Sequence, residues 1–492
     1  MLLVAGLLAA AVCAAQGVGI GTSSPNASAQ LDISSSARGL LIPRMDSNAV
    51  KAIAAPASGL MVYDTSRNEL MVNTGTAAVP NWQNLVGASG WQLGGNTVSG
   101  IKSLGTLNNF PLGFVVEGKY SGQIDSVGQN AMLGYGSGSN GTANWCTAFG
   151  DHALLYGGQG NIAIGDEAMD SSRTQFGIGI GWGAMRHVTG FENIGIGTGT
   201  LFVSSGEDNI AIGMNTMTDN TTGNFNIAMG TTASERNTTG ADNVAIGFDA
   251  SLANTIGSYN TSVGYAAMLF NQTGLGNTAV GYDALQHTTS SYYNTVVGFS
   301  SGQAYDNGYN NVLVGANNDV TGAGFYNVIA LGQAVTCTAS DQARIGNSAT
   351  NSIGGYADWT NFSDGRYKRN MRENVKGLDF IMRLRPITYN LDVTGIRSHL
   401  GQKAPADAGT QQSIAAREKE LLSGFAAQEV ETAAAASGYE FSGVDKPKNA
   451  NDFYGLRYGD FVVPLVKAVQ EQQKMIEELK QEVAELKQQL KH

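Results

Sequence analysis

A serine and a lysine five residues apart, Ser363 and Lys368, are the clearest candidates for chemistry in this sequence. A serine hydroxyl is a poor nucleophile unless a neighbouring base takes its proton. A lysine serves as that base only when burial or nearby cations favour its neutral form, and Arg366 and Arg369 are candidate cations. Because residues five apart lie on opposite faces of a strand and about 140° apart on a helix, a turn or a neighbouring subunit must bring the two side chains together.

The same two residues also have a purely structural interpretation. Ser363 can start a turn or cap a helix, and Lys368 can be a solvated side chain. Two residues cannot decide between this interpretation and nucleophilic catalysis, so the elements around them must be considered.

The chain after the serine predicts a small domain of helices and strands. A helix is expected from Leu378, and it ends before Pro386, which disfavours helical geometry at the preceding residue. Residues 388–392 predict a strand, residues 402–410 a loop, and residues 425–436 a second helix.

Before the serine, the sequence is a long array of short repeats. The core unit is Asn, an apolar or Thr residue, a small residue, Ile or Val, and Gly, as in residues 161–165, and it recurs through residues 133–332. Its closing glycines are 15 to 17 residues apart, with a constant spacing of 17 from Gly213 onward. Such a unit is too short to bury its own apolar face, so the units must stack on one another as a β-solenoid or β-roll.

The repeat predicts three structural features. The alternation of Ile, a small residue and Ile directs large side chains to one face of each strand and small ones to the other. The recurring Asn can form a ladder of side-chain amides along the stack. The closing Gly is explained by a turn with positive φ or by a close approach of two backbones.

Composition agrees with a repetitive β protein. Glycine accounts for 65 of 492 residues, and only 14 % of residues are charged. The net charge is −11, and 19 of the 29 Lys and Arg residues lie from Ser363 onward, which argues against a nucleic acid as partner. No cofactor motif is present, the histidines lack metal-binding spacing, and Cys146 and Cys337 are expected to be free buried thiols.

The two ends of the chain carry their own signals. Residues 1–15 are apolar and end in small residues, which predicts a secretory signal cut before Gln16. No other run approaches the ~20 apolar residues of a membrane span. Residues 464–492 carry an unbroken heptad pattern from Leu465 to Leu490, which predicts a coiled coil. Its β-branched residues at position a and Leu at position d favour two strands when taken alone.

Four sequence blocks after the array, residues 363–370, 377–381, 384–390 and 424–430, resemble a known domain. This is the intramolecular chaperone at the C-terminus of phage endosialidases and tail fibres, which trimerises the fibre and then releases itself through a Ser-Lys dyad. The resemblance implies that Ser363 is the nucleophile, that Lys368 is the base, and that the bond between Phe362 and Ser363 is cut.

Two further resemblances concern the rest of the chain. The repeats resemble the head repeats of trimeric autotransporter adhesins and the shafts of phage tail fibres. Residues 16–100 resemble the N-terminal region of tail-fibre-like proteins of Bacteroidetes-type bacteria and are interpreted as a β-rich attachment region. These resemblances imply a homotrimer, in conflict with the two strands that the heptads favour.

Together these features predict a mainly β protein: a trimeric β-solenoid or β-roll, a small α+β chaperone domain and a terminal coiled coil. The leading hypothesis is a secreted or cell-surface bacterial fibre, virion-associated if prophage-encoded, that cleaves itself before Ser363. The alternatives are an uncleaved adhesin with a permanent trimerisation cap and, more weakly, a glycan-degrading tailspike. Besides itself, the fibre could bind a cell-surface or glycan receptor. The expected segments are 1–15 (signal), 16–100 (N-terminal β region), 101–350 (repeat array), 351–362 (linker), 363–463 (chaperone) and 464–492 (coiled coil).

Overall fold

The computed structural model describes residues 17–85, 104–138, 143–304 and 306–490. The predicted signal segment, residues 1–15, lies outside these ranges. The chain divides into two compact units, residues 1–105 and 106–492. Strands outnumber helices, with 23 % of residues in strands and 16 % in helices, and the predicted mainly β solenoid fold is confirmed. In the described ranges, no helix combines the length and the apolar character that crossing a membrane requires.

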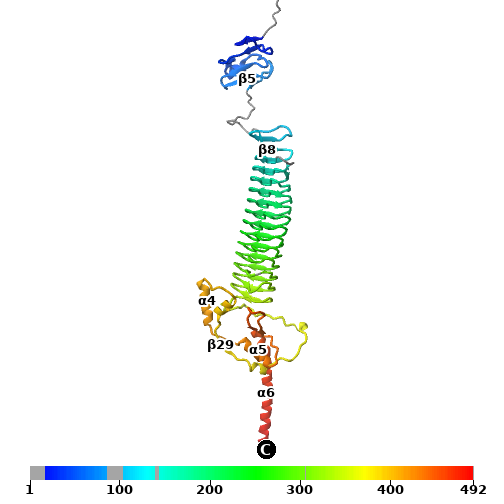
Figure 1. Ribbon diagram of the computed structural model, residues 1–492, viewed down its shortest axis with the longest axis vertical. Coiled ribbons are helices and arrows are strands. Elements are labelled where there is room, and N and C mark those ends of the chain that lie inside the picture. Colours follow the sequence, from blue (N-terminus) through cyan, green and yellow to red (C-terminus); the bar gives the residue numbers. More distant parts are fainter. Residues whose placement is uncertain (1–16, 86–103, 139–142, 305, 491–492) are drawn as a thin grey trace, which may run out of the picture. The chain divides into compact units, whose positions relative to one another are not determined.

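The first unit is a small β structure. A short parallel pair precedes a four-stranded sheet, and one helix packs on that sheet (Figure 1, blue). Its core contains Val50, Val62 and Met71. The elements are β1 (Val18–Ile20), β2 (Leu31–Ile33), β3 (Arg44–Met45), α1 (Ser47–Ala52), β4 (Met61–Asp64), β5 (Glu69–Asn73) and β6 (Trp82–Asn84).

The second unit begins with the repeat array, whose coils lie one above another (Figure 1). One strand from each coil joins a single 16-stranded sheet, which is parallel from β9 onward. Antiparallel strands β7 (Leu112–Val116) and β8 (Lys119–Asp125) lead into it. The parallel strands are β9 (Asn130–Leu133), β11 (Thr147–Phe149), β13 (Ile162–Ile164), β14 (Ile178–Ile180), β16 (Ile194–Ile196), β18 (Ile210–Ile212), β19 (Ile227–Met229), β20 (Val244–Ile246), β21 (Thr261–Val263), β22 (Thr278–Val280), β23 (Thr295–Val297), β24 (Val312–Val314), β26 (Ile329–Leu331) and β28 (Ala343–Ile345).

Shorter strand pairs lie elsewhere on the coils. Each pair joins neighbouring coils in parallel, as the long sheet does. They are β10 (Ala143–Asn144) with β12 (Gly158–Gln159), β15 (His187–Val188) with β17 (Val203–Ser204), and β25 (Asp319–Val320) with β27 (Thr336–Cys337).

Buried asparagines connect consecutive coils, as predicted. Asn243 is typical: its Nδ2 donates to Asn226 Oδ1 at 3.0 Å and to the Gly257 carbonyl at 2.8 Å, and its Oδ1 accepts from Asn260 Nδ2 at 3.2 Å. Because each amide both donates and accepts, its polar atoms are satisfied inside the coil. One ladder runs through Asn193, Asn209, Asn226, Asn243, Asn260, Asn277, Asn294 and Asn311, and a second through Asn220, Asn237, Asn254 and Asn271.

The closing glycines combine positive φ with close backbone contact, which confirms both explanations offered by the sequence. Gly264, for example, has a φ of 136°, and a Cβ there would lie 2.3 Å from the carbonyl oxygen of Gly281. No larger residue fits this geometry without moving the next coil.

Most strands of the array direct a small central side chain into the coil and two larger ones outward, although β23 and β24 bury the larger Val296 and Leu313. In β20, Ala245 is buried, whereas Ile246 is 37 % exposed. The core along the array consists mainly of Ala and Met, with Leu and Val. Cys146 and Cys337 are buried free thiols, as expected. Burial raises the pKa of the Cys337 thiol to about 11.

The C-terminal part of this unit is mixed α and β, with an aromatic core around Phe380, Val430 and Phe461. Two small antiparallel pairs, β29 with β30 and β31 with β32, accompany its helices. The elements are η1 (Gly365–Tyr367), α2 (Leu378–Ile381), β29 (Ile387–Tyr389), α3 (Val393–His399), α4 (Ala408–Lys419), β30 (Leu422–Gly424), α5 (Ala427–Ala436), β31 (Val444–Asp445), β32 (Gly455–Leu456), η2 (Tyr458–Phe461) and α6 (Val462–Gln489).

The details of this part differ from the prediction in three respects. The expected strand at 388–392 is β29, which ends at Tyr389 because Asp392 already caps the next helix by accepting from the Gly395 N–H. That helix, α3, and the following α4 were not predicted. The expected loop at 402–410 is shorter, since α4 begins at Ala408. The second predicted helix is confirmed as α5.

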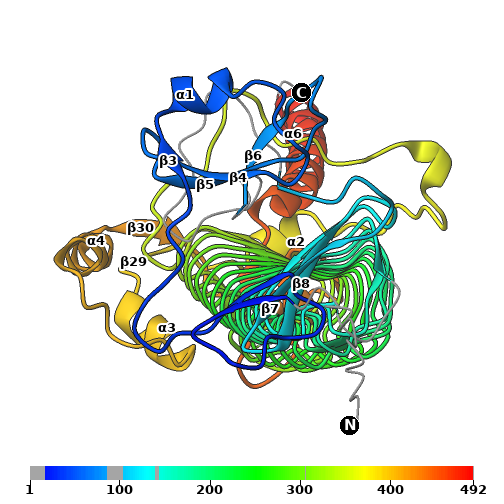
Figure 2. The ribbon, with the colours of Figure 1, turned by 90° about the horizontal axis from the view of Figure 1, so that it is seen from above.

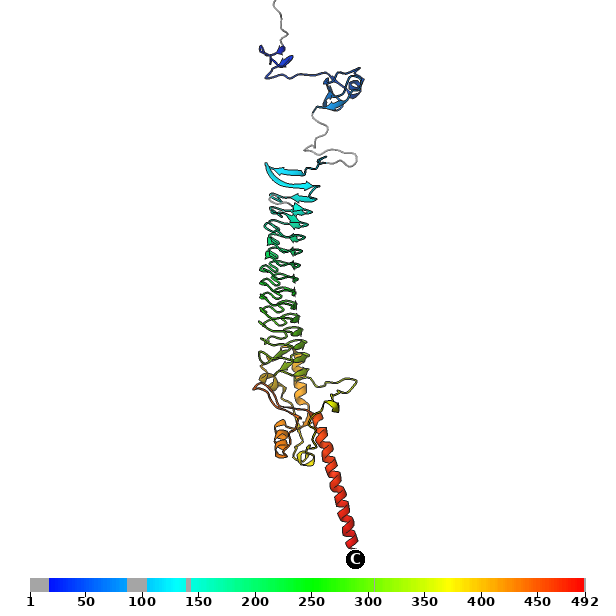
Figure 3. The ribbon, with the colours of Figure 1, turned by 90° about the vertical axis from the view of Figure 1, so that its right-hand side faces the viewer.

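The predicted heptad segment is helical. Helix α6 extends beyond the rest of the C-terminal part (Figure 3). Its heptad side chains are largely solvent-exposed in the single chain: Leu465, Val469, Ile476, Leu479, Val483 and Leu486. A coiled-coil partner for this stripe stays a prediction.

Candidate functional site

Ser363 and Lys368 lie on a long segment with little regular structure. Between β28 and α2 its only helix is the short η1, which contains residues 365–367 (Figure 2, yellow). Both side chains are exposed, and Phe362 is 79 % exposed. The peptide bond between Phe362 and Ser363 is therefore accessible to solvent in the single chain.

A capped turn brings the serine and the lysine together. Asp364 is the N-cap of η1, and its carboxylate accepts from the Arg366 N–H at 2.9 Å. The turn closes when the Lys368 N–H donates to the Gly365 carbonyl at 3.2 Å. As a result Lys368 Nζ lies 2.8 Å from Ser363 Oγ, within hydrogen-bond distance. The sequence required a turn or a second subunit for this approach, and the structure has the turn.

Asp364 was not among the predicted residues, although an Asp before a Gly is a recognisable turn signal. Ser363 itself does not cap the helix, because Asp364 does. The interpretation of Ser363 as the capping residue is thereby wrong.

The charge of Arg366 is neutralised within the same turn. Its guanidinium contacts the Asp364 carboxylate, with Nε at 2.9 Å and Nη2 at 2.6 Å from Oδ2. This pair lowers the pKa of Asp364 and raises that of Arg366. Arg366 was expected to supply a cationic field for Lys368, and its pairing with Asp364 removes most of that field. Arg369 stays as the expected cation.

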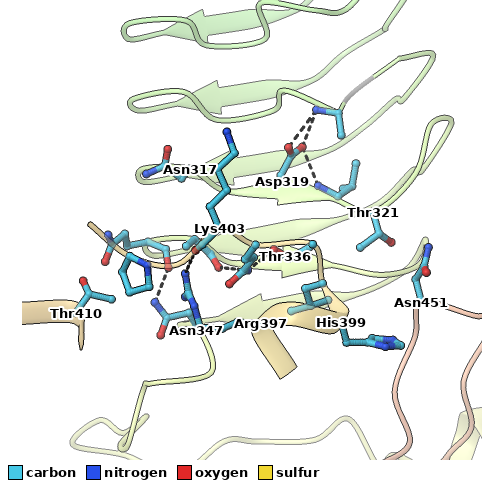
Figure 4. A pocket seen from close by; sticks show the side chains of 18 of the residues that line it. Asn317, Asp319, Thr321, Thr336, Asn347, Arg397, His399, Lys403, Thr410 and Asn451 are labelled. Atoms are coloured by element: carbon cyan, nitrogen blue, oxygen red, sulfur yellow. Dashed lines mark hydrogen bonds between the residues drawn. The ribbon is translucent and has the colours of Figure 1, made fainter. Parts of the chain in front are cut away.

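A second candidate site is a polar cleft of about 720 Å³ between the last coils and the segment around α3 (Figure 4). Asn317 and Asp319 from the array and Lys403 from the C-terminal part line it. Asp319 accepts from the backbone N–H groups of Ala304 and Val320 at 3.0 and 2.9 Å. Burial raises the pKa of the Asp319 carboxyl to about 6, against the opposing effect of these hydrogen bonds. Sequence reasoning missed this site because its walls are distant in the chain.

Repeated coils that lead into a small helical domain define a fibrous protein with a C-terminal accessory domain. Two family models match this chain, one in its N-terminal part and one in its C-terminal part. Residues 363–439 match the family described as chaperone of endosialidase, and residues 19–100 match the phage tail like trimerisation region. The predicted resemblance at the C-terminus is confirmed, and its match begins at Ser363 itself.

The matches indicate a tail-fibre-like trimer with an intramolecular chaperone, in an extracellular or virion-associated setting. The N-terminal region, interpreted from the sequence as an attachment region, matches a trimerisation region. Neither the curated proteins nor the solved structures contain a match to the chain.

Proposed function

We propose that the protein is a secreted homotrimeric fibre whose C-terminal domain promotes trimer folding and then cleaves the Phe362–Ser363 bond. The observation that carries the cleavage is the 2.8 Å contact between Lys368 Nζ and Ser363 Oγ, at the first residue of the chaperone match. The contact has the geometry that a nucleophile and its general base require.

The proposed reaction is an acyl shift followed by hydrolysis. Ser363 Oγ attacks the carbonyl carbon of Phe362 while Lys368 Nζ takes the hydroxyl proton. That proton passes to the nitrogen of Ser363 as the peptide bond breaks, which leaves an ester between Phe362 and the serine oxygen. Water then hydrolyses the ester to a Phe362 carboxylate and restores the Ser363 hydroxyl. No co-reactant other than water is consumed.

Assembly offers a physical reason for cleavage to wait. A lysine is neutral, and hence able to accept a proton, when it is withdrawn from water. Lys368 is exposed in the single chain. A neighbouring subunit that covers η1 would supply the missing burial, so that the cut follows trimer formation.

Trimerisation is supported by an apolar stripe on the outer face of the long sheet. Three of its partly exposed residues on neighbouring coils are Ile212, Met229 and Ile246. A contiguous apolar surface of this length is unusual on a monomer and typical of an interface. Replacing these three residues with Thr, which β21 carries at its own outward first position (Thr261), should weaken self-association about a hundredfold.

Light scattering on wild-type protein and the triple variant tests this. A mass near three times the 51.3 kDa chain is expected for protein kept intact by Ser363→Ala, with dissociation at higher concentration for the triple variant in the same background. A wild-type monomer at micromolar concentration would contradict the trimer.

Intact-mass measurement tests the cleavage. The wild type should yield a fragment containing residues 363–492, whereas Ser363→Ala and Lys368→Ala should stay intact. Lys368→Arg keeps the charge but cannot accept the proton, so it should also stay intact. Lys376→Ala, an exposed lysine outside the turn, is the matched control and should cleave normally.

The second candidate function is an uncleaved adhesin with an inert Ser363. The exposure of both Ser363 and Lys368 in the single chain favours it. Uncut wild-type trimers would establish this alternative over the processed fibre.

A further inference from the structure

The C-terminal domain reaches back to the last coil of the array through a buried carboxylate. The side chain of Asp452 is only 4 % exposed, and it contacts three residues of that coil. Its Oδ1 accepts from Thr338 Oγ1, from Gln342 Nε2 at 3.3 Å and from Arg344 at 3.5 Å. The hydrogen bonds from Thr338, Gln342 and the backbone outweigh burial, and the pKa of Asp452 is lowered.

Arg344 is held in place for this contact by the coil itself. Its Nη1 donates to the Thr336 carbonyl at 2.7 Å and its Nη2 to Thr338 Oγ1 at 2.7 Å. The last coil therefore presents a preformed, positively charged receptor for Asp452.

Neighbouring residues of the same loop extend the contact. Asn449 Nδ2 donates to the Thr338 carbonyl at 2.6 Å, and Lys448 Nζ donates to the Ser340 carbonyl at 3.1 Å. The loop thus donates hydrogen bonds to backbone carbonyls of the last coil, which has no following coil to supply them.

A second contact lies at the other side of the polar cleft. Gln402 Nε2 donates to the Ala334 carbonyl at 3.1 Å and to Thr336 Oγ1 at 2.7 Å. Gln402 precedes α4 by a few residues, so the two anchors come from separate segments of the C-terminal domain.

The last coil has a physical need for such a cover. Strand β28 pairs with β26 on one side only and is the edge of the long sheet. An open strand edge invites pairing with other chains, and terminal repeats of stacked proteins usually carry a cap.

We propose that Gln402 and residues 448–452 form a docking surface that keeps the C-terminal domain on the last coil without the peptide link at Phe362–Ser363. All the array residues in the contact precede Ser363, and Gln402, Lys448, Asn449 and Asp452 follow it. The contact therefore joins the two fragments that the proposed cleavage would create. If the proposed cleavage occurs, the cut domain therefore stays bound as a cap instead of leaving at once. Only this consequence rests on the proposed function; the docking contact itself does not.

The test separates docking from self-cleavage. In full-length protein carrying Ser363→Ala, residues 352–358, which are exposed and lack regular structure, are replaced with the recognition sequence of an added protease. After the added protease cuts, the fragments are analysed by native size exclusion with intact-mass detection. Because Ser363 is absent, the result does not depend on whether the wild type cleaves itself.

The two fragments should co-elute when Asp452 is present. Asp452→Asn should weaken their association about a hundredfold, because the buried Asp452 side chain then loses the charge that pairs with the partly exposed Arg344 guanidinium. Gln402→Ala, at the other anchor, should weaken it by about tenfold or less. The control is Asp445→Asn, whose carboxylate pairs with Arg457 inside the C-terminal domain and should leave co-elution unchanged.

Separation of the fragments in the parent protein would overturn the proposal. Equal retention in the parent and in both interface variants would overturn the assignment to these residues. If the wild type fails to cleave itself but the protease-cut fragments co-elute, the docking surface stands and the self-cleavage does not.

Discussion

The array and the C-terminal domain differ in the side chains that they bury: aliphatic Ala, Met and Leu in the array, aromatic rings in the domain. A coil of the array encloses Ala245 and leaves Ile246 partly exposed, whereas the C-terminal domain encloses Phe380 among other aromatic rings. A core of large side chains completes a domain by itself. The array buries Ala, Met and Leu side chains beside its amide ladders, and its outward isoleucines leave apolar surface for another chain. The aromatic core of the domain is therefore complete in the single chain, whereas the outward face of the array is left open, like the heptad stripe of α6.

The two regions also distribute their polar contacts differently. Along the array each Asn repeats the bond of the previous coil, so many equivalent groups share the stability. In the C-terminal domain single residues such as Asp364 and Asp452 make contacts that are not repeated from one structural unit to the next. Substitutions should therefore act through packing in one region and through individual contacts in the other.

The largest effect should come from a glycine of the array. Gly264→Ala places a Cβ 2.3 Å from the Gly281 carbonyl at a φ of 136°, so the stack must separate locally. The expected loss is more than about 4 kcal/mol in the free energy of unfolding, measured by denaturant titration. Gly459→Ala, where a Cβ meets nothing within 4 Å, is the control and should change stability by less than about 1 kcal/mol.

A pair of apolar truncations tests the contrast in packing directly. Phe380→Ala should destabilise the C-terminal domain by about 3–5 kcal/mol, because it empties a fully buried site. Ile246→Ala should cost about 1 kcal/mol in the dissociated chain, since that side chain is already partly exposed. Thermal unfolding at low and high protein concentration separates the two effects. A large, concentration-independent loss for Ile246→Ala would break the comparison.

Interrupting the amide ladder should have an intermediate effect. Asn243→Ala removes an acceptor for Asn260 and a donor to Asn226 and Gly257, and it leaves all three groups buried. The expected cost is about 2–4 kcal/mol. Hydrogen exchange should show the loss of protection concentrated in strands β19 to β21, and a uniform loss over the array would argue against a local ladder. Asn108→Ala, at an exposed position, serves as control.

The smallest effect concerns pH at the polar cleft. The pKa of Asp319 is about 6 in the folded chain and 3.8 ordinarily, so the folded state keeps a proton that the unfolded state has lost. The contribution of Asp319 to the free energy of unfolding is fully present below about pH 4 and is lost as the pH rises through about 6. Between pH 4 and 7 the wild type should lose about 1–2 kcal/mol that Asp319→Asn does not lose. Parallel pH profiles of the two proteins in denaturant titration measure this difference.

Local signals in the sequence were sufficient for the array. The 17-residue spacing, the recurring Asn and the closing Gly each have a mechanism that acts between adjacent coils, and adjacent coils are close in the chain. The Ser363 and Lys368 pair could also be proposed from its type, spacing and resemblance. The turn that joins the two residues depends on Asp364, which is adjacent to Ser363 in the chain, so it could also have been predicted from the sequence.

Distant contacts were out of reach. Asp452 contacts residues more than 100 positions away, and a lone Asp in a polar loop carries no sign of such partners. The helices α3 and α4 were missed since their apolar residues are few, with Val393 and Ile414 among those that are buried.

The sequence by itself determined that large and small side chains lie on opposite faces of most strands of the array, because side chains alternate along an extended backbone. It did not determine which face is inside. The tertiary structure decided that: the coils bury their asparagine ladders and Met side chains, and the strand positions that face them are mostly small, such as Ala245, with Val296 and Leu313 as larger exceptions. The apolar residues that would fill the core of an ordinary domain are therefore left on the surface, where another chain can cover them.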